Sequence, residues 1–276
     1  MALDASGAHG GIALSPIGQR FSERAAQRRA CLIPYITAGF PDPSATVEIM
    51  EAAADAGADV IELGIPFSDP LADGPTIQRS SFAALQKGTT VDTVLDALQT
   101  FRARRDTPTV LFTYLNPVLR RGLGEFCHEA AEAGADGLLL TDLPVGCDPG
   151  LEEQVMDAGL DWIRLLAPTT PRERVPLVAE GGSGFLYYIS RTGVTGARTE
   201  IRSELAAEVA ELREAVTLPI AVGFGISTPE QARMVALAAD GVVVGSALTT
   251  RLECDGVEGA AAFLASLRQG MDQEKC

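Results

Sequence analysis

The sequence predicts a single (β/α)₈ barrel, or TIM barrel, with an extra helix before its first strand. Short apolar, β-branched runs alternate eight times with longer Ala-rich stretches of helical periodicity. A weak internal repeat joins the helices to the strands, and the length of 276 residues suits a fold that typically needs about 250. We therefore expect one domain over 1–276, with a flexible tail over 1–14, a helix over 15–29 and the barrel over about 31–268.

Eight runs are the expected strands. They are 32–37, 60–64, 110–114, 137–141, 162–166, 185–189, 220–223 and 242–245. Runs such as GLLL and GVVV are apolar on both faces, which is typical of a parallel sheet covered by helices. Stretches such as SATVEIMEAAADAG and PEQARMVALAAD have helical periodicity and lie between them.

The repeat consists of AADAGAD (53–59), AAEAGAD (130–136), VMDAGLD (155–161) and ALAAD (236–240). Each copy is expected to end a helix and to lead into a strand. In the first three copies a glycine accepts the left-handed conformation that ends a helix, and the acid begins the link to the next strand.

An amphipathic helix is expected before the first strand, over 16–29. Ile17, Phe21, Ala25 and Ala26 fall on one side of it. We expect this helix to close the bottom of the barrel.

Charge and composition exclude several classes of protein. The net charge of −15, from 22 basic and 37 acidic residues, would repel a nucleic acid. The five cysteines are odd in number and have no CxxC spacing, which indicates reduced thiols. The N-terminus has no signal-peptide pattern, and no apolar run approaches the ~18 residues of a membrane span. We expect a cytoplasmic protein, or one from which a targeting segment has been removed.

The small number of histidines and lysines excludes several kinds of catalytic site. The histidines are His9 and His128, and the lysines are Lys87 and Lys275. A histidine-based zinc site, a Ser-His-Asp triad and a Cys-His pair lack their residues, so we expect no metal. Neither lysine is placed for Schiff-base chemistry in a pocket. The groups that remain for catalysis and binding are carboxylates, hydroxyls, arginines and backbone amides.

Glu62 is the first candidate catalytic residue, because it interrupts an apolar strand in IELGIPFSDPLADGP (61–75). By alternation it shares one side of the strand with Val60 and Gly64. If that side faces the barrel interior, burial raises the pKa of Glu62 from about 4.3 towards neutrality, and the carboxyl can exchange a proton near pH 7. The alternative is a glutamate paired with an arginine at a helix–sheet boundary.

Asp73 is the second candidate. It lies in a loop stiffened by prolines, and in this fold the loops that follow the strands form the active site. Asp73 could face a developing positive charge or accept a hydrogen bond from an N–H group. The alternative is that Asp69 or Asp73 caps the helix that follows.

Two glycine-containing loops after the last two expected strands predict a phosphate site. They are GFGIS (223–227) and GSAL (245–248), in which Gly225, Gly245 and Ser246 can present backbone N–H groups to an anion. The segment SRTGVTGARTEI (190–201) is rich in glycine and hydroxyl groups and is expected to form a mobile lid. A plain solvent loop is the alternative.

The segment IELGIPFSDPLADGPTIQ closely resembles the signature of the tryptophan synthase α subunit. LIPYITAGFPD (32–42) resembles the first strand and loop of the family, and LAPTTPRERV, YYISRTGVTG, AVGFGIS and VVVGSAL resemble later family segments in the right order. The resemblance covers about 15–268. It implies retro-aldol cleavage of indole-3-glycerol phosphate to indole and glyceraldehyde 3-phosphate, in L-tryptophan biosynthesis.

The resemblance also implies roles for individual residues. Glu62 would shuttle the proton, Asp73 would stabilise the indole N–H as positive charge develops, and Tyr187 would lie near Glu62. The expected substrate-binding residues are Tyr35 and Tyr114 at the indole ring, Thr195 in the lid, and Gly196, Gly225, Gly245 and Ser246 at the phosphate. Tyr35 stands where many relatives have Phe.

The partner implied by the resemblance is a β subunit in an α₂β₂ assembly, which receives indole through a tunnel. Pyridoxal phosphate is expected in that partner, and no cofactor is expected in this chain. The expected interface residues are Asp69, Pro70, Asn116, Pro117, Asp142 and Pro144. The alternatives are an indole-3-glycerol phosphate lyase that acts alone, a catalytically silent barrel that binds a phosphate ligand and regulates a partner, and a flavin or isomerase barrel.

Overall fold

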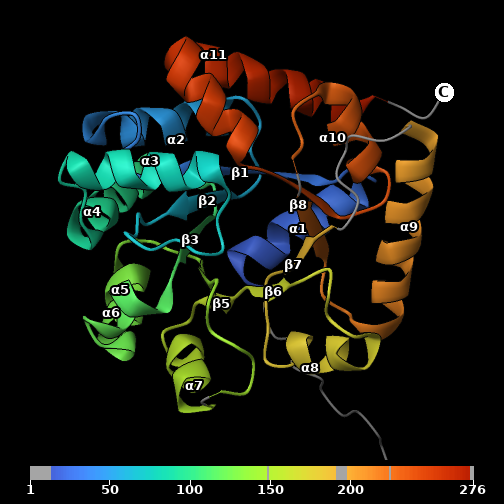
Figure 1. The fold of residues 1–276 in the computed structure, drawn as a ribbon, viewed down its shortest axis with the longest axis horizontal. Helices are drawn as coiled ribbons and strands as arrows, with labels where there is room; N and C mark the ends of the chain where they lie inside the picture. The colour runs from blue at the N-terminus through green and yellow to red at the C-terminus, as the bar shows by residue number, and fades with distance from the viewer. Residues whose placement is uncertain (1–13, 148, 191–197, 224, 274–276) are drawn as a thin grey trace, which may run out of the picture.

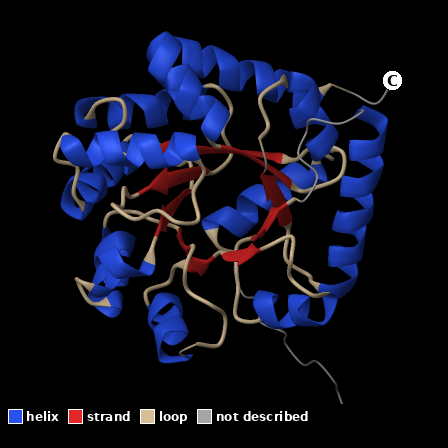
Figure 2. Ribbon diagram, in the orientation of Figure 1, coloured by secondary structure: helices blue, strands red, loops and turns tan. Residues whose placement is uncertain are grey.

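The computed structural model describes residues 14–147, 149–190, 198–223 and 225–273, and its strands form a nearly closed parallel barrel (Figures 1 and 2). The strands are β1 (Cys31–Thr37), β2 (Ile61–Gly64), β3 (Thr109–Thr113), β4 (Gly137–Leu140), β5 (Asp161–Trp162), β6 (Arg164–Leu166), β7 (Leu186–Ile189), β8 (Ile220–Gly223) and β9 (Gly241–Val244). Their order in the sheet is β5-β4-β3-β2-β1-β9-β8-β7-β6. Each expected strand is present, which confirms the predicted fold class.

The fifth expected strand forms two short segments. β5 pairs with β4, whereas β6 pairs with β7. Between them, Ile163 still donates its N–H to Leu138 on β4, at 2.9 Å. The chain thus changes its pairing partner at this point, which leaves a break between two segments that are adjacent in the sequence.

The helices surround the strands (Figure 1). They are α1 (Pro16–Ala26), α2 (Thr46–Asp55), α3 (Pro75–Gln86), α4 (Val91–Arg102), α5 (Leu115–Leu119), α6 (Leu123–Glu132), α7 (Pro149–Asp157), α8 (Val175–Ala179), α9 (Arg198–Ala215), α10 (Pro229–Ala236) and α11 (Ser246–Asp272), with 3₁₀ turns at Pro43–Ala45 and Arg172–Arg174. Strand side chains that point outward pack against these helices in one large apolar core.

A second, smaller core fills the barrel interior, and side-chain alternation decides which residues enter it. On β2, Ile61 and Leu63 belong to the outer core, whereas the preceding Val60 belongs to the inner one. Glu62 and Gly64 therefore share the inward side with Val60, as expected.

Helix α1 lies across one end of the barrel, in the middle of the ring of strands in Figure 1. Ile17 and Phe21 are buried in the inner core, and the Phe21 ring lies 5.4 Å from that of Phe185. The predicted closure of the barrel bottom is confirmed. Ala25 and Ala26 are exposed, so the apolar side of the helix is shorter than expected.

The glycines of the repeat have the predicted left-handed conformation. Gly57, Gly134 and Gly159 have φ angles of +96°, +95° and +77°. A side chain at these positions would be strained, so glycine allows the chain to leave each helix and turn into the next strand.

Three acids of the repeat tie neighbouring strands together at the bottom of the barrel. Each carboxylate accepts a hydrogen bond from the backbone at the start of the preceding strand. The pairs are Leu32 N with Asp59 Oδ2, Thr109 N with Asp136 Oδ2 and Ile220 N with Asp240 Oδ2, each at 2.8 Å. The repeat thus satisfies backbone donors at that end of the barrel, and the catalytic candidates lie at the other end.

Candidate active site

A cavity of about 370 Å³ lies at the carboxyl ends of the strands. Its lining residues are Tyr35, Glu62, Ala72, Asp73, Gly74, Ile77, Phe112, Thr141, Leu165, Tyr187, Ile189, Gly223, Gly225, Val243, Gly245 and Ser246. The volume falls within the range of roughly 300–1,000 Å³ typical of small-molecule sites. Both carboxylates predicted from the sequence line it, at the end of the barrel where this fold places catalytic residues.

Glu62 is completely buried in the wall of this cavity. Neither of its carboxyl oxygens has a hydrogen-bond partner among the described residues, and no arginine pairs with it there. Burial raises the pKa of Glu62 to about 8 from its usual 4.5, because the ionised form is poorly solvated. At neutral pH the carboxyl is mostly protonated, and it donates no hydrogen bond to any of the described residues.

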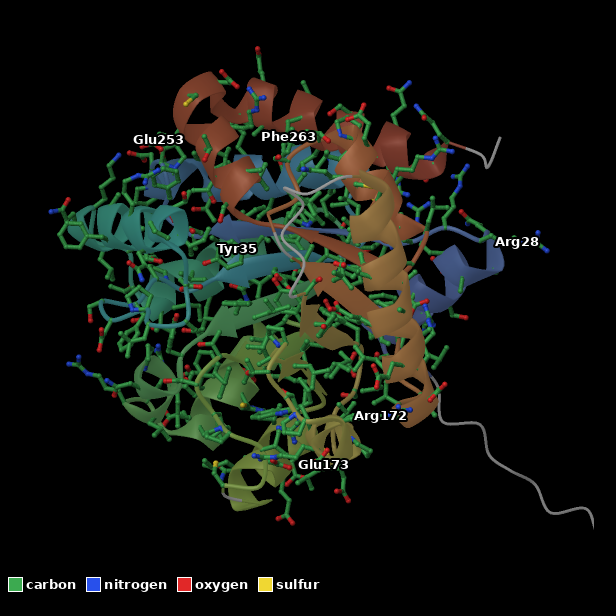
Figure 3. The ribbon with its side chains drawn as sticks, turned by 45° about the vertical axis from the view of Figure 1, so that its right-hand side comes forward. Arg28, Tyr35, Arg172, Glu173, Glu253 and Phe263 are labelled. Atoms are coloured by element: carbon green, nitrogen blue, oxygen red, sulfur yellow. The ribbon has the colours of Figure 1, made fainter. Side chains whose placement is uncertain are left out.

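Two tyrosines line the cavity with Glu62, Tyr35 on the adjacent strand β1 and Tyr187 on β7, and the ring of each lies over a glycine on a strand next to its own. A Cβ on Gly64 would lie 2.2 Å from the Tyr35 hydroxyl, and one on Gly223 would lie 2.5 Å from the Tyr187 hydroxyl. Burial raises the pKa of both phenols, and the charges of Glu62 and Asp73 raise it further. Both hydroxyls are therefore neutral, and both lie within the electrostatic influence of the two carboxylates. Figure 3 shows Tyr35 in the middle of the molecule, among the strands.

Asp73 faces the cavity from the loop between β2 and α3. The Tyr114 hydroxyl donates a hydrogen bond to Asp73 Oδ2 at 3.0 Å. Burial raises the pKa of Asp73, and this hydrogen bond acts in the opposite direction. Helix α3 begins with Gly74 as its N-cap and has no side-chain cap, so neither Asp69 nor Asp73 fulfils the capping alternative.

Tyr114 contacts the acidic loop that carries Asp73. It is buried behind Asp73, outside the residues that line the cavity. Its hydroxyl also accepts a hydrogen bond from Ala72 N at 3.0 Å, and its ring lies 5.3 Å from that of Phe67. Tyr114 thus holds the acidic loop in place, and its expected place at the indole ring stays a prediction.

The far wall of the cavity consists mainly of backbone. Gly223 ends β8, Gly225 follows it, and Gly245 leads into Ser246, the first residue of α11. Gly245 is the N-cap residue of α11 and has no side chain with which to cap the helix. The N–H groups in the first turn of this helix carry partial positive charge and face a site with little side-chain bulk, which suits an anion such as a phosphate.

The remaining apolar wall was not predicted from the sequence. Ile77, Phe112, Leu165, Ile189 and Val243 all contribute to it. Those on strands were discoverable, because each occupies the last or next-to-last inward position of its strand. Thr195 and Gly196, which were expected to bind substrate, lie outside the described residues, as does most of the predicted lid.

The expected interface residues lie around the rim at this end of the barrel. Asp69, Asn116, Asp142 and Pro144 are exposed, and Pro70 and Pro117 are partly so. Two of the rim loops are joined, since Leu115 N donates to Asp142 Oδ1 at 2.7 Å. Leu71, next to Pro70, is 83% exposed at this rim.

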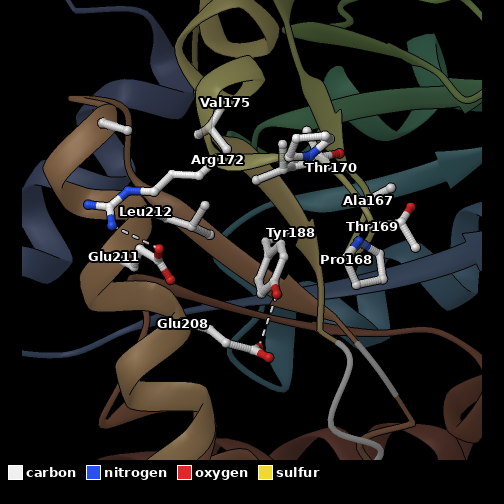
Figure 4. Close-up of a pocket in the computed structure, with 13 residues that line it drawn as sticks. Ala167, Pro168, Thr169, Thr170, Arg172, Val175, Tyr188, Glu208, Glu211 and Leu212 are labelled. Carbon is white, nitrogen blue, oxygen red and sulfur yellow. Dashed lines mark hydrogen bonds and ion pairs between the residues drawn. The ribbon is translucent and has the colours of Figure 1, made fainter.

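Two further cavities have different linings. One of about 270 Å³ lies between segment 166–172 and α9 (Figure 4), where Tyr188 donates to Glu208 at 3.0 Å and Arg172 pairs with Glu211 at 3.1 Å. Another of about 440 Å³ shares Thr141 and Leu165 with the first cavity. Among the described residues, neither cavity is lined by a carboxyl group that, like Glu62, is buried and has no hydrogen-bond partner. Within the described ranges, no three His, Cys, Asp or Glu residues are close enough to hold a metal.

The fold agrees with the comparisons with known proteins. The family model "Tryptophan synthase alpha chain" matches residues 21–275. This chain belongs to the tryptophan synthase alpha chain family. It is 47% identical over 262 residues to the tryptophan synthase alpha chain of Geobacter sp. (strain M21), covering 94% of this chain and 98% of that one. It is 49% identical over 264 residues to the one from Burkholderia thailandensis, covering 94% and 97%.

Solved structures give the same result. Tryptophan synthase subunit alpha from Legionella pneumophila str. Paris superposes with a TM-score of 0.86 at 40% identity, covering 94% of this chain and 99% of that chain. The family predicted from the IELGIPFSDPLADGPTIQ segment is therefore confirmed. In the part of the chain that the structure describes, no helix is both long and apolar enough to cross a membrane.

Proposed function

We propose that this chain cleaves indole-3-glycerol phosphate to indole and glyceraldehyde 3-phosphate, as the α subunit of a tryptophan synthase. The observation that supports this best is the state of Glu62, a fully buried carboxyl with no described partner in a cavity that also contains Asp73. Cleavage of this carbon–carbon bond needs a group that first donates and then accepts a proton near neutral pH.

Glu62 begins the reaction in its protonated form. It transfers its proton to C3 of the indole ring, which makes the ring positively charged and weakens the bond from C3 to the glycerol chain. The Glu62 carboxylate then accepts the proton of the hydroxyl group on the adjacent glycerol carbon. The carbon–carbon bond breaks, its electrons restore the aromatic ring, and the hydroxyl-bearing carbon becomes the aldehyde. Glu62 is protonated again at the end.

Asp73 stabilises the charged intermediate. As positive charge develops on the ring, the indole N–H becomes a stronger donor, and the Asp73 carboxylate accepts its hydrogen bond. The Tyr114 hydroxyl keeps the carboxylate oriented and favours its ionised form. A group oriented before the reaction stabilises developing charge more effectively than water does, because it does not need to reorganise.

The phosphate is bound by backbone groups at the far wall. Gly225, Gly245 and Ser246 line the same cavity as the carboxylates, and α11 starts at Ser246 after a glycine that has no capping side chain. The net charge of −15 does not favour an anionic substrate, so these local donors must supply the binding energy.

The exposed rim supports an association with a β subunit. Leu71, the Asp69-Pro70 turn and the joined loops around Asn116 and Asp142 form one end of the molecule, beside the mouth of the cavity. We propose an α₂β₂ assembly in which the β subunit holds pyridoxal phosphate and receives the indole, and in which this chain needs no cofactor.

The test is indole release from indole-3-glycerol phosphate, measured with and without a β subunit from a related tryptophan synthase. We expect slow release by the chain alone and a faster rate in the complex. Equal rates in both conditions would support a lyase that acts alone. No indole in either condition, with phosphate ligand still bound, would indicate a silent binding barrel and overturn the catalytic proposal.

A further inference from the structure

A second cavity lies at the break between β5 and β6, beside the active site. Trp162 on β5 pairs with β4, whereas Arg164 and the residues after it pair with β7. The cavity of about 440 Å³ is lined from both sides of this break, by 140–145 at the end of β4 and by 162–165 with parts of the loop and helix that follow. It shares Thr141 and Leu165 with the active-site cavity, so the two cavities adjoin.

Arg164 is a buried cation in the wall of this second cavity. It is 2% exposed, and its side chain occupies room left by a glycine, because a Cβ on Gly182 would lie 2.7 Å from Arg164 Cγ. Burial of a guanidinium is costly unless its charge is paired and its N–H groups are hydrogen-bonded. The charge is paired, since Nη2 lies 2.9 Å from Glu152 Oε2 on α7 and also donates to the Glu180 carbonyl at 3.3 Å.

The Nε–H group of Arg164 is left without a partner. Both polar contacts of this side chain are made by Nη2, whereas Nε is buried and has no hydrogen-bond partner among the described residues. The guanidinium lies 4.9 Å from the centroid of the Trp162 ring, which also lines the cavity. An unsatisfied buried donor is unfavourable, and a ligand oxygen that accepts from Nε would remove that penalty.

A second arginine lines the same cavity. Arg174 is exposed at the end of the 3₁₀ turn Arg172–Arg174, and it forms no ion pair with a carboxylate in the part of the chain that the structure describes. Arg172, two residues earlier, pairs with Glu211 on α9 at 3.1 Å and does not line this cavity. Asp142 is a further charged lining residue, at the rim, where its Oδ1 accepts Leu115 N at 2.7 Å. An anion is therefore expected near the arginines and away from Asp142.

The rest of the lining is largely apolar. Leu143, Val145 and Val178 contribute to it, and the Trp162 ring offers a flat face. A volume of about 440 Å³ falls in the range of roughly 300–1,000 Å³ typical of small-molecule sites. The cavity thus combines a mainly apolar wall with a few donors of positive charge, a lining that fixes the orientation of a ligand with one anionic end.

We propose that this cavity is a second ligand site, for a small carboxylate ion with an apolar body. The carboxylate accepts the free Nε–H of Arg164 and is attracted to Arg174, because guanidinium groups and carboxylates form charge-assisted hydrogen bonds. The apolar body lies against Trp162. A ligand held there also contacts Thr141 and Leu165, which separate it from the active-site cavity. The site does not depend on the cleavage reaction proposed above.

The test uses Trp162 as a reporter, because it is the single tryptophan of the chain and it lines this cavity. The full chain is titrated with phenylacetate while tryptophan fluorescence is recorded. Phenylacetamide, which has the same apolar body without the charge, and acetate, which has the charge without the body, are the matched probes. We expect a saturable change with phenylacetate, and at least tenfold weaker binding of the two matched probes.

Two arginine variants locate the charge. Arg174→Gln should weaken phenylacetate binding about three- to fivefold, the scale of an exposed ion pair. Arg172→Gln is its control, because it makes the same charge change two residues away and should keep wild-type affinity. Arg164→Lys retains a cation opposite Glu152 but has no Nε–H group, so we expect about tenfold weaker binding or more. Melting temperatures show whether each variant is folded, and Arg174→Gln, at an exposed position, provides the test if Arg164→Lys does not fold.

Three outcomes would overturn the proposal. The first is no saturable fluorescence change with phenylacetate. The second is equal affinity for phenylacetate and phenylacetamide, which would show an apolar slot in which the guanidinium groups play no part. The third is equal affinity of Arg174→Gln and Arg172→Gln for phenylacetate, which would place the ligand's charge elsewhere.

Discussion

The hydroxyl of Tyr114 donates a hydrogen bond to the carboxylate of Asp73 at 3.0 Å while it accepts another from the N–H of Ala72 at the same distance. A neutral phenol with a strongly raised pKa is a dependable donor at all physiological pH values. It therefore opposes the effect of burial on the pKa of Asp73, favours the ionised form of that carboxylate and orients it.

Tyr114→Phe should lower kcat/KM for indole-3-glycerol phosphate by about 10- to 100-fold, since a hydrogen bond to a charged group is worth about 1.5–3 kcal/mol. The pKa of Asp73 should rise when its donor is lost, so the acid limb of the pH–rate profile should move to higher pH. Asp73→Asn should cost ~10²–10³ in rate and abolish that limb. An unchanged pH profile in Tyr114→Phe would contradict the role given to Tyr114.

Glu62 should make the protein less stable as pH rises. Its pKa is about 8 in the folded state and 4.5 in its ordinary, solvated state. Between these values the unfolded chain releases the proton and the folded chain keeps it, so the free energy of unfolding decreases with pH, by at most ~5 kcal/mol. The contribution of Glu62 to the free energy of unfolding is fully present below pH 4.5 and is lost above pH 8.

Urea unfolding of wild type and Glu62→Gln at pH 5, 6.5 and 8 checks this prediction. The glutamine side chain does not titrate, so the variant should lose less stability than the wild type over this range. Other titrating groups affect both proteins equally, and the difference in slope isolates residue 62. Parallel stability curves would show that the pKa of Glu62 is not raised.

Gly245→Ala should weaken phosphate binding without disturbing the fold. A Cβ at this position would meet Tyr35 Cβ at 3.6 Å, an ordinary contact, and φ is −112°, which any residue can adopt. The methyl group would instead obstruct the backbone donors at the start of α11. We expect KM to rise about tenfold or more, as for a lost hydrogen bond to a charged group. Calorimetric titration with inorganic phosphate provides a readout independent of turnover, and wild-type affinity would argue against a phosphate at Gly245.

Leu71→Ser should weaken binding to the β subunit. Leu71 is 83% exposed in the isolated chain, and full burial of a leucine contributes about 1.5–3 kcal/mol. The dissociation constant should increase roughly 10- to 100-fold, whereas the slow activity of the chain alone should stay the same. Phe82→Ser is a suitable control, because Phe82 is 60% exposed on α3 but lies away from the rim loops. Equal effects of the two substitutions would contradict a specific interface at Leu71.

Much of the fold and the key carboxylate could be predicted because they depend on local patterns. Alternation along β2 placed Glu62 on the inward side, and the repeated glycines predicted the ends of three helices. The same patterns could not show that the fifth strand changes partners at Ile163, because that change depends on how the barrel closes.

The contacts of Tyr114 and the contact between Thr37 and Ser80 could not be predicted for a related reason. Alternation indicates which side of a strand a residue occupies, but it does not show how far along the barrel axis its side chain reaches. Tyr114 follows the last residue of β3, so its ring extends over the acidic loop rather than into the cavity. The contact between Thr37 and Ser80 depends on the docking of α3 against β1, to which neither local sequence points.

Single-turnover release of indole by Glu62→Gln, compared with wild type, tests the central role of Glu62 most directly. Glutamine has the size of glutamate but can neither donate the proton to C3 nor accept the one from the glycerol hydroxyl. We predict no detectable indole from the variant, with affinity for glyceraldehyde 3-phosphate and the melting temperature at pH 6 close to those of wild type. Indole release at the wild-type rate would contradict proton transfer by Glu62 and require another residue to perform it.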